Sequence, residues 1–163
     1  TDAVVKYINE SRDLGLEILP PDVNESGWKF TVVSDTRIRF GLGAIRNVGH
    51  TAAESIIKAR SEKPFTSLYD LCERVDLRVC NKRVFEALIH AGALDSLPGH
   101  RAAYLAALDG AMQHASLAQA EIATGQGSLF GDLGGDPQET AAPLQPTLPN
   151  VKEFSESERL THE

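Results

Sequence analysis

The feature that most constrains the fold is a repeated pattern in which two helical segments flank a short turn containing glycine. In its first occurrence, the apolar residues 42–45 lead into Asn47-Val48-Gly49, and helical spacing resumes over residues 52–60. In its second, the helical residues 84–89 lead into Ala91-Gly92-Ala93-Leu94, followed by a further helix from about residue 100. The glycine in each turn breaks the helical spacing, so the two flanking segments are not one long helix. Neither segment shows the apolar–polar alternation of a strand. We therefore predict a mainly α fold built on tandem helix-hairpin-helix units.

Such a turn has a physical use. It exposes backbone N–H groups at the start of the following helix, where the positive end of the helix dipole also lies, so that a phosphate can bind without any base being read. Val48 is expected to point inward and lock the turn, and Asn47 tolerates a positive φ. The alternative is a helical hairpin with a purely structural role. The candidate DNA-binding residues are Arg46, Asn47, Val48, Gly49, His50, Thr51, Lys82, Arg83, Gly92 and Arg101.

Residues 1–40 are predicted to form a small α+β element. A helix over residues 2–14 ends at Gly15, residues 16–19 are extended, and two strands at 28–33 and 37–40 flank a turn at 34–36. A sheet of this size is not independently stable, so we expect it to pack on the first helix or on the hairpin units.

Residues 41–123 are predicted to be the tandem helix-hairpin-helix domain. Its connecting helix spans residues 68–75, with Thr66 or Ser67 as the N-cap and Asp70 in the first turn. An alanine-rich helix from residue 100 to about 122 serves as packing, and Gly110 is its weak point.

Residues 124–163 have the Gly, Pro, Thr and acidic composition of a flexible linker. Gln126, Leu129 and Phe130 form a Gln-x-x-Leu-Phe pattern at its start. Two adjacent bulky apolar side chains on such an arm favour uptake by a partner, and burial contributes roughly 1.5–3 kcal/mol for each. The alternative is that Leu129 and Phe130 fold back onto the domain.

Charge and cysteine content narrow the class of protein. The net charge is −7, but residues 37–101 hold eleven basic and seven acidic side chains, which indicates a local polyanion site. The two cysteines, Cys72 and Cys80, lack Cys-x-x-Cys spacing, so we expect no metal site and a reduced, cytoplasmic setting. No apolar run is long enough to cross a membrane, and no signal peptide is visible. The absence of an initiator Met indicates an excised piece of a longer protein.

Residues 16–24, 40–49 and 81–94 resemble the bacterial replicative DNA polymerases of the C family, the polymerase III alpha subunits. The resemblance implies that residues 1–40 end the fingers, that residues 41–123 grip duplex product, and that residues 124–163 are the clamp-binding arm. It places Gln126, Leu129 and Phe130 at the pocket of a sliding clamp, and it implies other holoenzyme subunits as partners of the parent enzyme. Asn47 stands where the family usually has glycine.

The same resemblance places the catalytic carboxylates and their Mg²⁺ in a palm domain outside this chain, so we expect no catalytic residue and no cofactor here. The sequence thus predicts an inactive processivity segment of a bacterial DNA-directed DNA polymerase, a nucleotidyltransferase of DNA replication. Two alternatives stay open, a stand-alone helix-hairpin-helix repair accessory domain and a helical protein-interaction adaptor. A glycosylase would need a catalytic Lys or Asp just past the hairpin, whereas Lys58 lies nine residues on.

Overall fold

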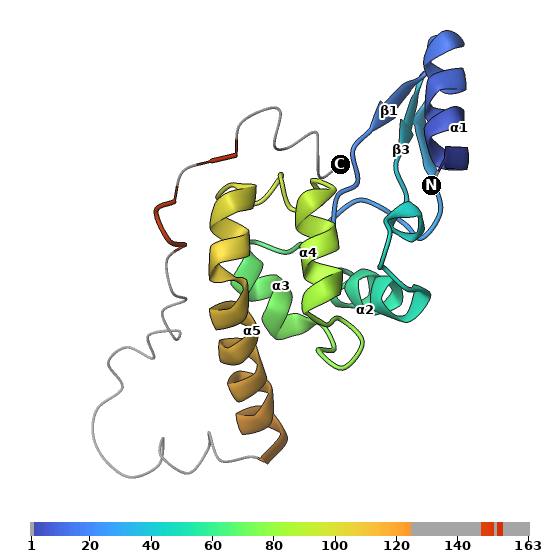
Figure 1. Cartoon of the computed structure of the whole chain (residues 1–163). Helices are drawn as coiled ribbons and strands as arrows, with labels where there is room; N and C mark the ends of the chain where they lie inside the picture. The colour runs from blue at the N-terminus through green and yellow to red at the C-terminus, as the bar shows by residue number, and fades with distance from the viewer. Residues whose placement is uncertain (1, 125–147, 152, 155–163) are drawn as a thin grey trace.

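The computed structural model describes residues 2–124, 148–151 and 153–154. Helix α1 (Asp2–Asp13) lies beside a small sheet at one end of the molecule, and the remaining helices pack together at the other (Figure 1). The prediction of a mainly helical chain with a small α+β element at its start is confirmed. Gln126, Leu129 and Phe130 fall outside the described residues.

The sheet has the order β1-β3-β2, with β1 (Glu17–Leu19), β2 (Thr31–Ser34) and β3 (Arg37–Arg39). Strand β3 lies in the centre, parallel to β1 and antiparallel to β2, and Ile18 and Val32 both stand opposite Ile38. The strand expected from residue 28 begins only at Thr31. Its first residues leave the sheet because the carbonyls of Gly27 and Trp28 accept hydrogen bonds from the N–H groups of Leu42 and Gly43, each at 2.9 Å.

The first helical unit is shorter than the sequence pattern suggested. Its opening segment is a single 3₁₀ turn, η1 (Leu42–Ala44), and the full helix α2 (His50–Arg60) follows the glycine turn. Gly43 explains the close approach here, because a Cβ at this position would lie 2.8 Å from the indole ring of Trp28. The chain can press this tightly against Trp28 only with a residue that has no side chain.

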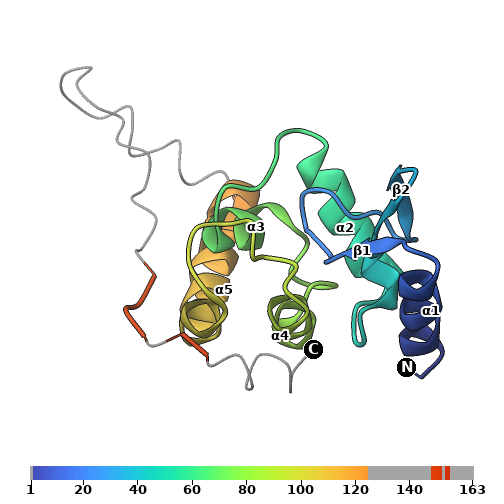
Figure 2. The same ribbon diagram turned by 90° about the horizontal axis from the view of Figure 1, so that it is seen from above.

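The remaining helices are α3 (Leu68–Arg74), α4 (Lys82–His90) and α5 (Arg101–Thr124). Ser67 is the N-cap of α3, since its hydroxyl accepts a hydrogen bond from the N–H of Asp70 at 3.1 Å. Helix α5 runs through Gly110 without a break and packs against α3 and α4. In Figures 1 and 2 it forms the flank of the molecule farthest from α1.

Residues on both sides of position 40 share one core. Val23 is fully buried, and its N–H donates to the carbonyl of Ala93 at 2.9 Å. The sheet residues were predicted to pack on the first helix or on the hairpin units, and of these residues Trp28 and Phe40 pack against the core that the hairpin units form. The largest fully buried side chains are Tyr104, Phe85, Leu42, Ile56, Leu68, Leu71, Leu88, Ile89, Leu94, Leu108, Val23 and Val75.

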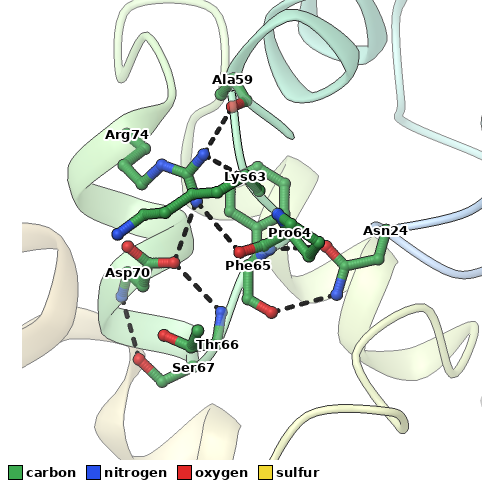
Figure 3. A network of polar contacts seen from close by, with 9 residues as sticks. All are labelled: Asn24, Ala59, Lys63, Pro64, Phe65, Thr66, Ser67, Asp70 and Arg74. Carbon is green, nitrogen blue, oxygen red and sulfur yellow. Dashed lines mark hydrogen bonds and ion pairs between the residues drawn. The ribbon is translucent and has the colours of Figure 1, made fainter. Parts of the chain in front are cut away.

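A polar network fixes the connection from α2 to α3 (Figure 3). The side chain of Asn24 both accepts from the N–H of Phe65 at 2.7 Å and donates to its carbonyl at 3.1 Å. Arg74 donates to the carbonyls of Ala59 and Lys63 and pairs with Asp70 at 3.0 Å. Its guanidinium also lies over the ring of Phe65, 4.8 Å from the centroid. The network links the N-terminal element, the α2–α3 connection and α3 through hydrogen bonds and one ion pair.

The two cysteines lie in this core as free thiols. Burial raises the pKa of Cys72 to about 12 and that of Cys80 to about 11. Both thiols are therefore protonated at neutral pH and serve as small apolar side chains.

Candidate nucleic-acid interface

The turn between η1 and α2, residues 46–49, has the conformation that the sequence predicted. Asn47 adopts φ 70°, in the left-handed region, and the exposed side chain faces away from the core. Val48 is 5% exposed, and its N–H donates to the carbonyl of Ile45 at 3.2 Å. The buried valine anchors the turn, while its neighbours Arg46 and Gly49 lie at the surface.

The N-terminus of α2 is open. Gly49 is its N-cap and has no side chain to bond the first amides, and a Cβ built there would meet nothing within 4 Å. By contrast, Ser67 and Asn81 cap α3 and α4, and His100 Nδ1 accepts from the N–H of Ala103 in the first turn of α5. Helix α2 thus combines the positive end of its dipole with first N–H groups that its N-cap residue does not bond, and the space beside Gly49 is open. This combination is what an anion needs to bind at a helix N-terminus.

Trp28 supports this helix end from the side. Its ring meets that of His50, the first residue of α2, edge to face with centroids 4.8 Å apart. His50 Nδ1 also lies 3.5 Å from the carboxylate of Glu54, one turn further along the helix. His50 and Thr51 are both exposed, and they lie in the first turn of α2, next to this aromatic contact.

A groove of about 690 Å³ brings residues from both helical units together. Arg46 and Asn47 line it from the first unit, and Arg83 and Arg101 line it from the second. Arg46 and Arg83 are exposed, and neither makes an ion pair within the part of the chain that the structure describes. Two predicted basic residues, 37 positions apart in sequence, thus face one surface depression.

The turn of the second unit, residues 91–94, leaves no open space beside its glycine, unlike the turn at residues 46–49. Gly92 is buried at φ 84°, and the N–H of Ala93 donates back to the carbonyl of Leu88 at 2.9 Å, as in a Schellman motif. A Cβ at Gly92 would lie 2.6 Å from Nη2 of Arg101. The guanidinium of Arg101 therefore fills the space that a ligand would need at this turn.

Arg101 itself is 5% exposed and tied to the protein. Its Nη2 lies 2.9 Å from Oδ2 of Asp95, its Nε lies 3.2 Å from Oδ1, and its Nη1 donates to the carbonyl of His90. These contacts hold the buried guanidinium of Arg101 against the turn at Gly92.

The start of α4 is also occupied. The side chain of Asn81 accepts from the N–H of Val84 at 3.1 Å, and Lys82 Nζ lies 2.9 Å from the carboxylate of Asp109 on α5. This pairing with Asp109 raises the pKa of Lys82. Of the predicted basic residues in the second unit, Arg83 is therefore the one that reaches the groove as an exposed side chain without an ion pair in the described chain.

Comparison with known proteins agrees with this geometry. The family model described as "Helix-hairpin-helix motif" matches residues 15–104, a span from β1 to the first turn of α5. The chain belongs to the helix-hairpin-helix family. The match includes the three strands, the turn at residues 46–49, helices α2, α3 and α4, and the first turn of α5.

Three curated relatives named DNA polymerase III subunit alpha show the resemblance that the sequence predicted. The protein of Vibrio cholerae is 41% identical over 164 residues, and that of Pseudomonas aeruginosa is 42% identical over 179 residues, each covering 100% of this chain. The protein of Escherichia coli K12 is 41% identical over 140 residues, or 85% of the chain. The aligned regions make up 14%, 15% and 12% of these relatives, so the chain corresponds to a small part of their length.

The described part of this helix-hairpin-helix protein has neither a cluster of side chains suited to a metal ion nor a membrane-spanning helix. Within residues 2–124 and the short segments at 148–154, no group of three His, Cys, Asp or Glu side chains is arranged to hold a metal ion. Among the same residues, every helix is too short or too polar to cross a membrane.

Sequence reasoning missed two residues that shape the interface. Trp28 was assigned to a strand because residues 28–33 alternate, yet it supports the start of α2. Asp95 was not considered, although it neutralises Arg101 and closes the second turn. No local pattern around either residue identifies its partner, which the chain brings close only on folding.

Proposed function

We propose that this segment binds duplex DNA through the turn at residues 46–49, independently of base sequence. The observation that supports the proposal most directly is the open N-terminus of α2, where no side chain caps the first amides and Gly49 leaves free space. A phosphate oxygen there would accept hydrogen bonds from backbone N–H groups, which contact no base edge.

The remaining candidate residues act around this point. The guanidinium of Arg46 stands next to the turn, and His50 and Thr51 begin the helix, so these side chains would flank the bound phosphate. Lys82 and Arg83, at the exposed start of α4, would contact the backbone further along. In this tandem arrangement the second unit supplies positive charge and support, while Gly92 and Arg101 maintain its shape.

The replacement Gly49→Asp tests the phosphate site, because it should preserve or raise the stability of the chain and lower its affinity for DNA. Aspartate is a good N-cap, so the variant should unfold at the same or a higher urea concentration than the parent chain. Its carboxylate would occupy the position of the phosphate, so affinity for a labelled blunt duplex at 50 mM salt should fall by about tenfold or more.

Gly110→Ala is the matched control. A Cβ at Gly110 also meets nothing within 4 Å, but the residue lies in the middle of α5. This variant should bind duplex as the parent does. If Gly49→Asp binds the duplex as tightly as Gly110→Ala, the first turn is not the phosphate site.

We also propose that the chain acts within a bacterial replicative DNA polymerase in the cytoplasm, where it supports processive template-directed synthesis. Its similarity along the whole chain to proteins named DNA polymerase III subunit alpha supports this context. Gln126, Leu129 and Phe130 would dock on the sliding clamp, with the two apolar side chains in a pocket. The isolated segment is expected to have no polymerase activity.

The clamp proposal has its own test. A chain carrying both Leu129→Ala and Phe130→Ala should lose binding to a bacterial sliding clamp, because it lacks the apolar anchors, and should keep its affinity for duplex DNA. Clamp binding by the double variant equal to that of the parent chain would mean that the contact lies elsewhere.

A further inference from the structure

The groove described above is lined by three arginines that have no acidic partner in the described part of the chain. Arg12 lies in the last turn of α1, Arg46 in the turn before α2, and Arg83 in the first turn of α4. Each is exposed, and none makes an ion pair within the described residues. In Figure 2 the segment leading into α2 passes between α4 and α1, which accounts for the convergence of these three elements.

Most other arginines of the described chain are already engaged. Arg39 pairs with Glu25, Arg74 with Asp70, Arg78 with Asp76 and Arg101 with Asp95, while Arg60 donates to two backbone carbonyls. Arg37 on β3 is exposed and makes no ion pair there, but it does not line the groove. Three of the four exposed arginines that make no ion pair in the described chain thus line this one groove.

Between the arginines, the groove has an apolar lining. Ile18, Phe40, Ile45 and Ala87 contribute to it, and the ring of Phe40 is held edge to face by Phe30 with centroids 4.9 Å apart. Glu86 is the acidic residue among the groove's lining side chains. The surface therefore offers guanidinium groups beside apolar and aromatic contacts.

This combination fits unpaired nucleotides better than a duplex. The outer surface of a duplex presents phosphates and sugars and keeps its base faces stacked inside, whereas a single strand exposes base faces that pack on apolar and aromatic side chains. Arginine binds phosphate oxygens through its planar fork of N–H groups. Asn47 belongs both to the groove and to the turn at residues 46–49, so a strand that leaves the duplex there could enter the groove directly.

We infer that this groove binds single-stranded nucleic acid, with phosphates at Arg12, Arg46 and Arg83 and bases against the Phe40 side of the groove. The inference extends the proposed function, because Arg46 and Asn47 serve both the duplex site and the groove. Arg12 and the apolar lining belong to the groove alone.

The test uses a fluorescein-labelled twelve-residue oligo(dT) and the whole chain at low salt. The double variant Arg12→Gln with Arg83→Gln should bind it about tenfold or more weakly, and the slope of log K against log salt should fall by about 1.4, or 0.7 for each lost phosphate contact. Arg37→Gln is the matched control, since it removes an equally exposed arginine away from the groove. Equal losses from the groove and control variants would overturn the proposal.

A second probe examines the apolar lining. An abasic oligonucleotide of the same length retains the phosphates and lacks the bases, so it should bind clearly more weakly than oligo(dT). Equal affinity would show that bases do not contact the groove. Displacement of oligo(dT) by an acidic poly-glutamate peptide at a lower concentration than by unlabelled oligo(dT) would assign the groove to an acidic protein segment and contradict the inference.

The failure of this inference can be distinguished from failure of the duplex site. Gly49→Asp should weaken blunt-duplex binding and leave oligo(dT) binding within about twofold, while Arg12→Gln alone should do the reverse. If Arg12→Gln leaves oligo(dT) affinity unchanged while Gly49→Asp abolishes duplex binding, the protein has the duplex site and lacks the single-strand site.

Discussion

Trp28 and His50 meet edge to face, with ring centroids 4.8 Å apart and ring planes at 77°. The contact joins the loop before β2 to the first residue of α2, across a sequence separation that contains the whole of β2, β3 and η1. The position of the open helix end therefore depends on an aromatic side chain from the N-terminal element. This relationship makes the sheet side of the molecule part of the proposed DNA-binding surface.

Replacing Trp28 with alanine should destabilise the chain and disturb the start of α2. The indole is half-buried against Gly43 and His50, so we expect a loss of about 2–4 kcal/mol in the free energy of unfolding, at the lower end for aromatic truncations. Urea denaturation followed by circular dichroism measures it. Val32→Ala, at a side chain that is 74% exposed, should change stability by less than about 0.5 kcal/mol. Similar losses in the two variants would contradict a supporting role for Trp28.

Asn47 should respond differently to two small replacements. At φ 70°, alanine places its Cβ against the backbone, so Asn47→Ala should lower the free energy of unfolding by about 1–2 kcal/mol. Glycine adopts this conformation freely, so Asn47→Gly should be close to neutral. Thermal or urea unfolding of the two variants side by side gives the comparison. Equal stability of the two would mean that the turn relaxes away from the left-handed conformation.

The Arg74–Asp70 pair of Figure 3 is predicted to matter far more than a surface pair. Asp70 is 6% exposed, and Arg74→Met would leave its carboxylate without a charged partner, with an expected loss of about 3–5 kcal/mol. Arg78, whose side chain is 90% exposed in its pair with Asp76, is the matched control. Arg78→Met should cost less than about 1 kcal/mol.

The chain should lose stability in alkaline solution. Burial raises the pKa of Cys72 and Tyr104 to about 12 and that of Cys80 to about 11, so the unfolded chain releases these protons at a lower pH than the folded chain does. The free energy of unfolding should therefore be unaffected below about pH 8.5 and fall between there and pH 12. Urea midpoints at pH 8 and pH 10.5 measure the change.

A variant with Cys72→Ala and Cys80→Ala isolates the thiol contribution. It should be less stable than the parent at pH 8, because it leaves small cavities, yet its stability should decline less steeply above pH 9. Parallel decline in the two chains would assign the alkaline loss to other groups.

Local chemistry was sufficient to predict several of these features. The end of α1 before Gly15, the cap at Ser67 and the left-handed Asn47 each depend on one residue and its immediate neighbours. Val48 could be assigned to the core because a turn this short needs an apolar anchor. In each case the interaction that decides the structure lies within a few residues.

The features that sequence reasoning did not predict depend on distant partners. Trp28 leaves the strand pattern because its carbonyl bonds Gly43, and alternation alone gives no sign of that competition. In the sequence Arg101 looks like the other basic residues of the segment. In the structure it is buried and bonds to Asp95 and to the carbonyl of His90. The groove likewise brings together residues of α1, of the turn before α2 and of α4, which lie far apart in the sequence.

The burial of Cys72 and Cys80 has a practical consequence, because the chain contains no other cysteine. A thiol with a pKa of about 12 holds roughly three-thousandfold less thiolate at neutral pH than an ordinary surface cysteine with a pKa near 8.5. A single cysteine introduced at an exposed site such as Thr51 would therefore react selectively with a maleimide dye. The two native thiols should therefore add little background labelling when a dye on an introduced cysteine is used to measure DNA binding by fluorescence.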